Sequence, residues 1–177
     1  MVEILYKQKI SLLGDENVGK TCIISQYVDK KFLNEYRPTL RASFLQKILE
    51  SKELNNKIDG AIELNIWEIA GQRSYQEDLM TDYYIRGSHG CILVFDVTRT
   101  STIKSLSSWK KKIDKQCGEI PFIVVGNKND LNYDEKAIKE KIYSLFGENF
   151  PMIFTSAKTG ENIDLAFHEI AKLIMNS

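Results

Sequence analysis

Short apolar runs alternate with amphipathic segments along most of the chain. Runs rich in β-branched residues occupy Ile4–Leu13, Cys91–Val97, Phe122–Gly126 and Met152–Thr155. Continuous apolar runs of this length are typical of strands that helices bury on both faces. We therefore expect a sheet whose central strands are covered on both sides.

Two further segments have the pattern of a hairpin. Ala42–Glu50 and Ala61–Trp67 are rich in strand-forming residues, and the polar segment Ser51–Gly60 joins them. A polar turn between two such runs favours antiparallel pairing. We expect this hairpin to add the one antiparallel strand of the sheet.

Apolar residues at helical spacing follow most of the strands, in Lys20–Val28, Ser101–Lys115, Asp134–Phe146 and Asn162–Met175. A regular order of strand and then helix predicts an α/β fold: a six-stranded, mostly parallel sheet with helices on both faces. We expect residues 1–177 to form a single domain. Ligands of such folds bind beyond the carboxyl ends of the strands, so functional motifs should follow strands directly.

Composition narrows the class of protein. The chain is 43% apolar, and its 24 basic residues balance its 24 acidic ones, whereas a protein that binds nucleic acid normally carries a basic excess. No apolar run is long enough for a transmembrane helix, and the N-terminus has no signal-peptide pattern. Cys22, Cys91 and Cys117 are odd in number and lie in periodic segments. We expect free thiols and a cytoplasmic protein.

The segment Gly14–Thr21 reads Gly-Asp-Glu-Asn-Val-Gly-Lys-Thr, which fits the P-loop pattern G-x-x-x-x-G-K-[ST]. It lies between a predicted strand and a predicted helix, as that motif requires. Its glycines allow the loop to curl so that N–H groups point at phosphate oxygens, and the helix N-terminus adds positive potential. We expect Lys20 to reach the β- and γ-phosphates and Thr21 to ligate Mg²⁺.

Two later motifs indicate guanine as the base. Asn127-Lys-Asn-Asp130 follows one strand, and Thr155-Ser-Ala-Lys158 follows another. One carboxylate can accept both the N1–H and the 2-amino group of guanine, and Asp130 suits this task, whereas adenine would leave it unpaired. We expect Asn127 to brace the loops, the Lys128 stem to cover the base and the Ala157 N–H to donate to O6. Taken alone, the first motif is a common polar turn.

With these motifs in order, the sequence resembles the small GTPases of the Ras superfamily, and among them the Rab branch. The resemblance covers nearly the whole chain and implies the P-loop NTPase fold. Rab-like stretches include Trp67 before the third motif, Tyr83-Tyr-Ile-Arg-Gly87, Phe95-Asp-Val-Thr98 and Thr155-Ser-Ala-Lys-Thr-Gly-Glu-Asn162. The implied function is a GTP/GDP switch in vesicle trafficking that hydrolyses GTP with Mg²⁺.

The resemblance also assigns roles to single residues. Thr39 is implied to ligate Mg²⁺ and sense the γ-phosphate, Phe32 to lie across the guanine, Gln72 to orient the attacking water and the Gly71 N–H to bind the γ-phosphate. The implied catalytic residues are Gln72, Lys20 and Thr39, and the implied metal-binding residues are Thr21, Thr39 and Glu68. The full set expected at the nucleotide is Gly14, Asp15, Glu16, Asn17, Val18, Gly19, Lys20, Thr21, Cys22, Phe32, Tyr36, Thr39, Gly71, Asn127, Lys128, Asp130, Ser156, Ala157 and Lys158.

The implied partners are effectors, exchange factors and GTPase-activating proteins, which would bind through two switch loops at about 33–45 and 68–86. Phe44, Trp67 and Tyr83 match an aromatic triad that Rab proteins present to effectors, although from the residues alone they could equally fill the core. The resemblance places the protein, as a monomer, on the cytosolic face of endomembranes. Membrane attachment would require a prenylated tail beyond this chain.

Departures from the family pattern gather where the γ-phosphate would lie. Glu68 stands in place of an aspartate that normally holds a Mg²⁺-bound water, and Ile69 replaces a threonine. Glu16 replaces a glycine or serine of the P-loop, while Arg41 and Arg73 replace a glycine and a glutamate. The extra methylene of Glu68 is expected to weaken Mg²⁺ binding, unless the backbone adjusts and Glu68 serves as well as an aspartate.

These departures leave two functions open. Thr39 and Gln72 favour a GTPase, whereas Glu16 and Glu68 favour a guanine-nucleotide-binding module with negligible hydrolysis. A P-loop kinase or ATPase is disfavoured because Asp130 and Ala157 would then have no purpose.

Overall fold

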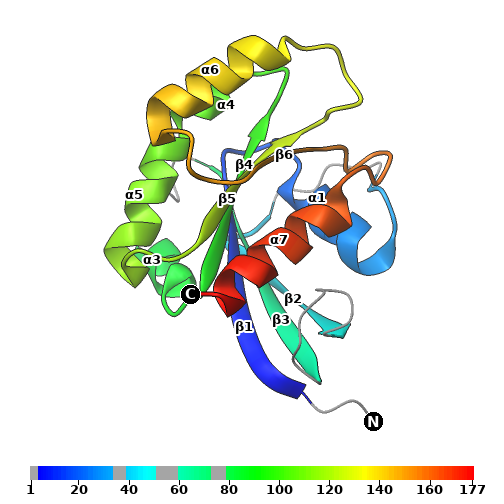
Figure 1. Cartoon of the computed structure of the whole chain (residues 1–177), viewed down its shortest axis with the longest axis vertical. Helices are drawn as coiled ribbons and strands as arrows, with labels where there is room; N and C mark the ends of the chain where they lie inside the picture. Colours follow the sequence, from blue (N-terminus) through cyan, green and yellow to red (C-terminus); the bar gives the residue numbers. More distant parts are fainter. Residues whose placement is uncertain (1–3, 34–38, 51–59, 73–78) are drawn as a thin grey trace.

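The structure, a computed structural model, describes residues 4–33, 39–50, 60–72 and 79–177. These residues form a six-stranded sheet in the order β2-β3-β1-β4-β5-β6 (Figure 1). Its strands are β1 (Ile4–Leu13), β2 (Ala42–Glu50), β3 (Ala61–Ile69), β4 (Gly90–Asp96), β5 (Phe122–Asn127) and β6 (Met152–Thr155). Only the β2–β3 pair is antiparallel. The predicted fold class is confirmed.

The described helices are α1 (Lys20–Asp29), α3 (Leu79–Ile85), α4 (Ser101–Lys104), α5 (Leu106–Cys117), α6 (Glu135–Phe146) and α7 (Ile163–Met175). The single helix predicted over Ser101–Lys115 is wrong, because the chain divides into two helices at Ser105. Thr102 Oγ1 accepts a hydrogen bond from the Asp96 N–H, which ties α4 to the end of β4. Helix α3 was not predicted, because its seven residues give little helical periodicity.

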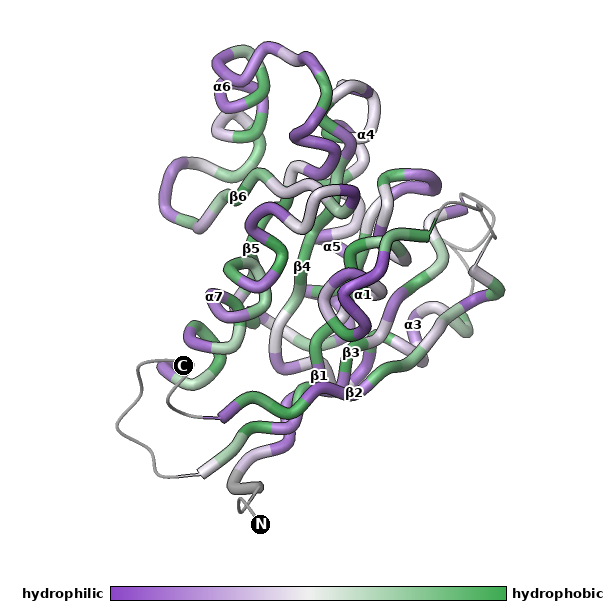
Figure 2. Tube along the Cα trace, turned by 90° about the vertical axis from the view of Figure 1, so that its right-hand side faces the viewer, coloured by the Kyte–Doolittle hydropathy of each residue, from purple (hydrophilic) through white to green (hydrophobic). Residues whose placement is uncertain are grey.

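The sheet carries a hydrophobic core on each face. Figure 1 shows α1 and α7 on one side of the strands and α3, α5 and α6 on the other. The Tyr27 and Phe167 rings stack at 3.8 Å between α1 and α7, while Trp109 and Ile142 anchor the opposite layer. Along α7, hydrophobic and hydrophilic positions alternate, as Figure 2 shows. This two-sided burial leaves the carboxyl ends of the strands for the functional site.

The α1–α7 contact gives a direct test of the core. Phe167→Ala should lower the free energy of unfolding by about 3–5 kcal/mol, because it removes a fully buried ring and leaves a cavity. Leu165→Ala on the same helix is the control, since Leu165 is 45% exposed and its loss should stay below about 1 kcal/mol. Chemical denaturation measures both values. Equal losses would contradict the stacked arrangement.

Candidate functional site

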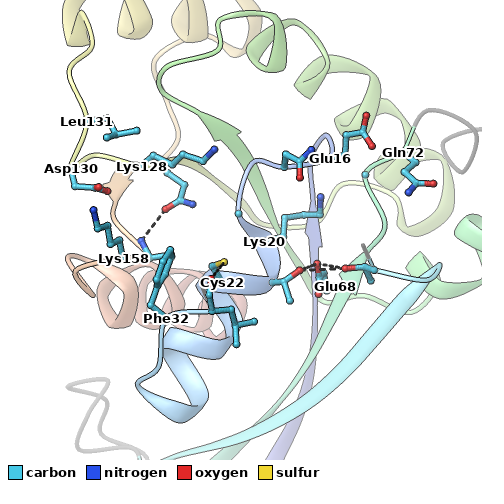
Figure 3. A pocket seen from close by; sticks show the side chains of 18 residues that line it. Glu16, Lys20, Cys22, Phe32, Glu68, Gln72, Lys128, Asp130, Leu131 and Lys158 are labelled. Carbon is cyan, nitrogen blue, oxygen red and sulfur yellow. Dashed lines mark hydrogen bonds between the residues drawn. The ribbon is translucent and has the colours of Figure 1, made fainter. Parts of the chain in front are cut away.

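A cavity of about 760 Å³ opens at the carboxyl ends of the strands. It gathers most of the site residues predicted from the sequence, which come from four distant parts of the chain: Glu16, Asn17, Gly19, Lys20, Thr21, Cys22, Phe32, Thr39, Glu68, Gly71, Gln72, Asn127, Lys128, Asp130, Ala157 and Lys158. Leu33 and Leu131 also line the cavity and were not singled out by the sequence. Figure 3 shows Asp130, Leu131 and Lys128 on one side and Lys20, Glu16 and Gln72 on the other.

The other predicted residues that the structure describes do not line this cavity. Gly14 and Val18 are buried within the P-loop, and Asp15 faces α5. Ser156 lies behind Asp130 and donates to its Oδ1 atom at 2.6 Å. Tyr36 and Arg73 lie outside the described residues.

The P-loop between β1 and α1 requires its two glycines. A Cβ atom on Gly14 would come within 2.2 Å of the Val94 carbonyl oxygen, and one on Gly19, whose φ is +96°, within 2.3 Å of Asn127 Nδ2. Both positions therefore exclude a side chain. Gly71 approaches the loop from β3 so closely that a Cβ there would lie 2.3 Å from the Asp15 carbonyl carbon.

Lys20 is the buried cation of the loop. Its Nζ donates to the carbonyl oxygens of Gly14 and Asp15, each at 2.8 Å, and only 5% of the residue is exposed. Burial lowers the pKa of Lys20 to about 8, although the negative charges of Glu68, Asp15 and Glu16 act in the opposite direction. An anion in the cavity would stabilise the charged ammonium.

Side chains that the sequence did not reveal hold the outer side of the P-loop. Ser105 and Trp109 donate to the two carboxylate oxygens of Asp15, at 2.7 and 3.3 Å. Arg99 Nη2 donates to the Glu16 carbonyl oxygen at 2.9 Å. These partners lie more than eighty residues away in sequence, so no local motif could have indicated them.

The two loops predicted to bind the base are joined through Asn127. Its Nδ2 donates to the Val18 carbonyl oxygen at 2.9 Å, and its Oδ1 accepts from Thr155 Oγ1 and the Ala157 N–H. The bracing role expected of Asn127 agrees with these bonds. The Ala157 N–H has an intramolecular acceptor here, and its donation to guanine O6 stays a prediction.

Lys128 is fixed at its charged end. Its Nζ pairs with Asp96 Oδ2 at 2.6 Å, which leaves its aliphatic stem along the cavity. Asp96 is 1% exposed and also accepts from Thr98 and Arg99. Burial alone would raise the pKa of Asp96, but the hydrogen bonds from Lys128 and Thr98 outweigh it and lower the pKa.

The predicted metal-binding residues lie together on the β2–β3 side. Glu68 Oε1 accepts from Thr21 Oγ1 at 2.5 Å and from Thr39 Oγ1 at 2.8 Å, and the two threonine oxygens are 3.3 Å apart. Neighbouring oxygens around octahedral Mg²⁺ are about 2.9 Å apart, and Mg²⁺ prefers oxygen ligands. The donor set therefore fits Mg²⁺. The longer side chain of Glu68 thus reaches both threonines.

Two other residues that depart from the family pattern, Glu16 and Arg41, lie in different surroundings from Glu68. Glu16 is exposed at the mouth of the cavity, and Figure 3 shows it on the same side of the cavity as Gln72. Arg41 keeps the left-handed backbone, with φ of +65°, that glycine adopts readily. Its carbonyl oxygen accepts from the Ala70 N–H at 2.8 Å. The backbone geometry is thus retained despite the substitution.

An aromatic surface lies beside the site. The rings of Phe44 and Trp67 are 5.1 Å apart, and Tyr84 connects Trp67 to Tyr83 with two centroid distances of 5.9 Å. Phe44 is 45% and Tyr83 66% exposed, while Trp67 is half-buried with Lys9 over its ring. Phe44 and Tyr83 therefore do not fill the core.

Comparisons with known proteins give a consistent picture. A sequence model of the Ras family matches residues 9–176. The Ras-related protein Rab7 of Pisum sativum is 35% identical over 96% of this chain and 82% of its own length. Rab7 of Drosophila melanogaster is 36% identical over 93% of this chain and 78% of its own length. Rab-7a of Dictyostelium discoideum is 37% identical over 93% of this chain and 80% of its own length. Among the described residues, no helix is long and apolar enough to cross a membrane.

The lowered pKa of Lys20 predicts proton uptake when a phosphate ligand binds. At pH 8 about half of the Lys20 side chains are neutral, and contact with phosphate should raise the pKa and charge them. Calorimetry of GDP binding at pH 8, in buffers of different ionisation enthalpy, should show uptake of about half a proton. At pH 7 most Lys20 side chains are already charged, so proton uptake should fall to about 0.1 proton per bound GDP. No buffer dependence at pH 8 would refute the assignment.

Proposed function

The chain belongs to the Ras family, as a Rab-like small GTPase that hydrolyses GTP in membrane trafficking, and from this premise we propose how its residues share that work. One observation carries the proposal: residues from the P-loop, Thr39, Glu68 and both base loops line a single cavity. The Rab7 relatives support a GTPase rather than a guanine-nucleotide-binding module with negligible hydrolysis.

We assign the base to the side of the cavity formed by Asp130, Lys128 and Ala157. The Asp130 carboxylate accepts from guanine N1–H and the 2-amino group, while Ser156 fixes its direction. The Lys128 stem and Phe32, which is 40% exposed at the cavity rim, enclose the purine. This arrangement rejects adenine because the carboxylate would be buried beside an acceptor.

The phosphates belong at the P-loop. Lys20, released from the Gly14 and Asp15 carbonyl oxygens, donates to phosphate oxygens, and the N–H groups of the loop and of Gly71 add further donors. Thr21, Thr39 and Glu68 would hold Mg²⁺, and the bound ion would supply positive charge beside the phosphate oxygens. Gln72 orients the attacking water. Apart from Lys20, which turns from the carbonyl oxygens to the phosphates, the N–H donors of the loop need little reorganisation in the reaction.

The switch loops at about 33–45 and 68–86 are proposed to bind effectors, exchange factors and GTPase-activating proteins; residues 34–38 and 73–78 of them lie outside the described residues. The exposed rings of Phe44 and Tyr83 support an effector surface there. We further propose that the protein works on the cytosolic face of endomembranes, in keeping with its Rab7 relatives.

Guanine selectivity is predicted to depend on Asp130. Asp130→Asn replaces one acceptor by a donor, so it should weaken GTP and GDP binding and favour xanthine nucleotides, whose 2-oxo group accepts. We expect the GTP/XTP affinity ratio to fall by at least a hundredfold. Competition binding with labelled GDP measures the ratio. An unchanged ratio would show that the base lies elsewhere.

Glu16 is predicted to slow GTP hydrolysis. A carboxylate at the cavity mouth repels the γ-phosphate and obstructs an incoming arginine, a contact worth about 10³–10⁵ in rate. Glu16→Ser should raise single-turnover hydrolysis at least tenfold in the presence of an activating protein. Glu148→Ser is the control, because Glu148 is exposed and outside the cavity lining. An unchanged rate would mean that Glu16 keeps its carboxylate turned into solvent throughout.

A further inference from the structure

The Glu68 carboxylate has a third hydroxyl partner that the metal-binding prediction does not use. Ser43 Oγ donates to Glu68 Oε2 at 2.9 Å, while Thr21 and Thr39 both donate to Oε1. The two carboxylate oxygens therefore have separate tasks. One faces the threonines that would hold Mg²⁺, and the other is tied to β2.

The position of Ser43 is set by the sheet. In the antiparallel β2–β3 pair, Ser43 is the residue directly opposite Glu68. Directly opposed residues extend their side chains to the same face of a sheet at short range. The hydroxyl therefore reaches the carboxylate from a fixed backbone position, without help from a mobile side chain.

The burial of Glu68 makes its hydrogen bond with Ser43 important for the carboxylate. Glu68 is 2% exposed, and a buried charged oxygen without a donor is strongly disfavoured. Glutamate also has one more rotatable bond than aspartate, so its carboxylate has more orientations to choose from. A donor on Oε2 restricts this choice and turns Oε1 toward the threonines.

We propose that Ser43 is a positioning residue that aims Glu68 at the magnesium site. The Ser43–Glu68 pair then does for this chain what a shorter aspartate does alone. The proposal rests on the proposed function in one respect, namely that Thr21, Thr39 and Glu68 hold Mg²⁺ beside a guanine nucleotide. It identifies a compensating residue for the departure at Glu68 and explains why the longer acid is accommodated.

The test is the Mg²⁺ dependence of labelled GDP release in four proteins: the unchanged chain, Ser43→Ala, Glu68→Asp and the double variant. Ser43→Ala should raise the Mg²⁺ midpoint for GDP retention about tenfold, since lost support for a metal ligand typically weakens metal binding by 10- to 100-fold. In the Glu68→Asp background the same change should shift the midpoint less than twofold, because the shorter carboxylate ends one methylene short of Ser43.

Two controls separate positioning from folding. Ser43→Thr keeps the hydroxyl and should restore the midpoint to within twofold of the unchanged chain. Ser144→Ala removes a serine hydroxyl on α6 that donates to the Lys141 carbonyl oxygen, far from Glu68 in the sequence, and it should have no effect. Thermal unfolding in a chelator shows whether each variant is folded before Mg²⁺ is added.

The outcomes are distinct. An unchanged midpoint in Ser43→Ala, or an equal shift in both backgrounds, overturns the role of Ser43. Failure of the unchanged chain to retain GDP, or retention that ignores Mg²⁺, instead overturns the proposed function. A background-dependent shift with threonine rescue supports the proposal.

Discussion

The curl of the P-loop, held by donors from distant parts of the chain, is the constraint on which the site depends. Lys20 donates hydrogen bonds to the Gly14 and Asp15 carbonyl oxygens. Arg99 donates to the Glu16 carbonyl oxygen, and Asn127 donates to the Val18 carbonyl oxygen. With its carbonyl groups bound by protein donors, the loop keeps a conformation in which its N–H groups are available to an anion. The P-loop conformation is therefore held by Lys20 of α1, Asn127 of β5 and Arg99 of the turn that follows β4.

The two acidic departures act through different physics because their burial differs. Glu16 is exposed, so water and salt weaken the repulsion that its charge can exert at the cavity mouth. Glu68 is buried and has three hydroxyl donors, so its charge is retained by specific hydrogen bonds. Loss of the Glu68 carboxylate would remove the three hydrogen bonds that join Thr21, Thr39 and Ser43 through it.

Local patterns were enough to predict the six strands, the P-loop and the two base motifs, because each depends on residues adjacent in sequence. The break at Ser105 was missed because the apolar spacing of Ser101–Lys115 does not mark it, and that spacing does not reveal the hydrogen bond between Thr102 and the end of β4 either. Arg99, Trp109 and Ser43 were missed for the same reason, since each reaches the site through a contact distant in sequence. Sequence spacing identifies the residues that would contact a ligand more readily than it identifies the residues that hold those ligand-contacting residues in place.

The β2–β3 pair connects the metal site to the aromatic surface. Ser43 opposite Glu68 and Phe44 opposite Trp67 are consecutive pairs of one register, and successive residues of a strand face opposite sides of a sheet. Glu68 thus faces the cavity while Phe44 and Trp67 face outward, one residue further along each strand. Backbone pairing between β2 and β3 fixes both pairs in this register. The same two strands therefore carry Glu68, one of the proposed magnesium ligands, and two rings of the aromatic surface on which a partner would bind.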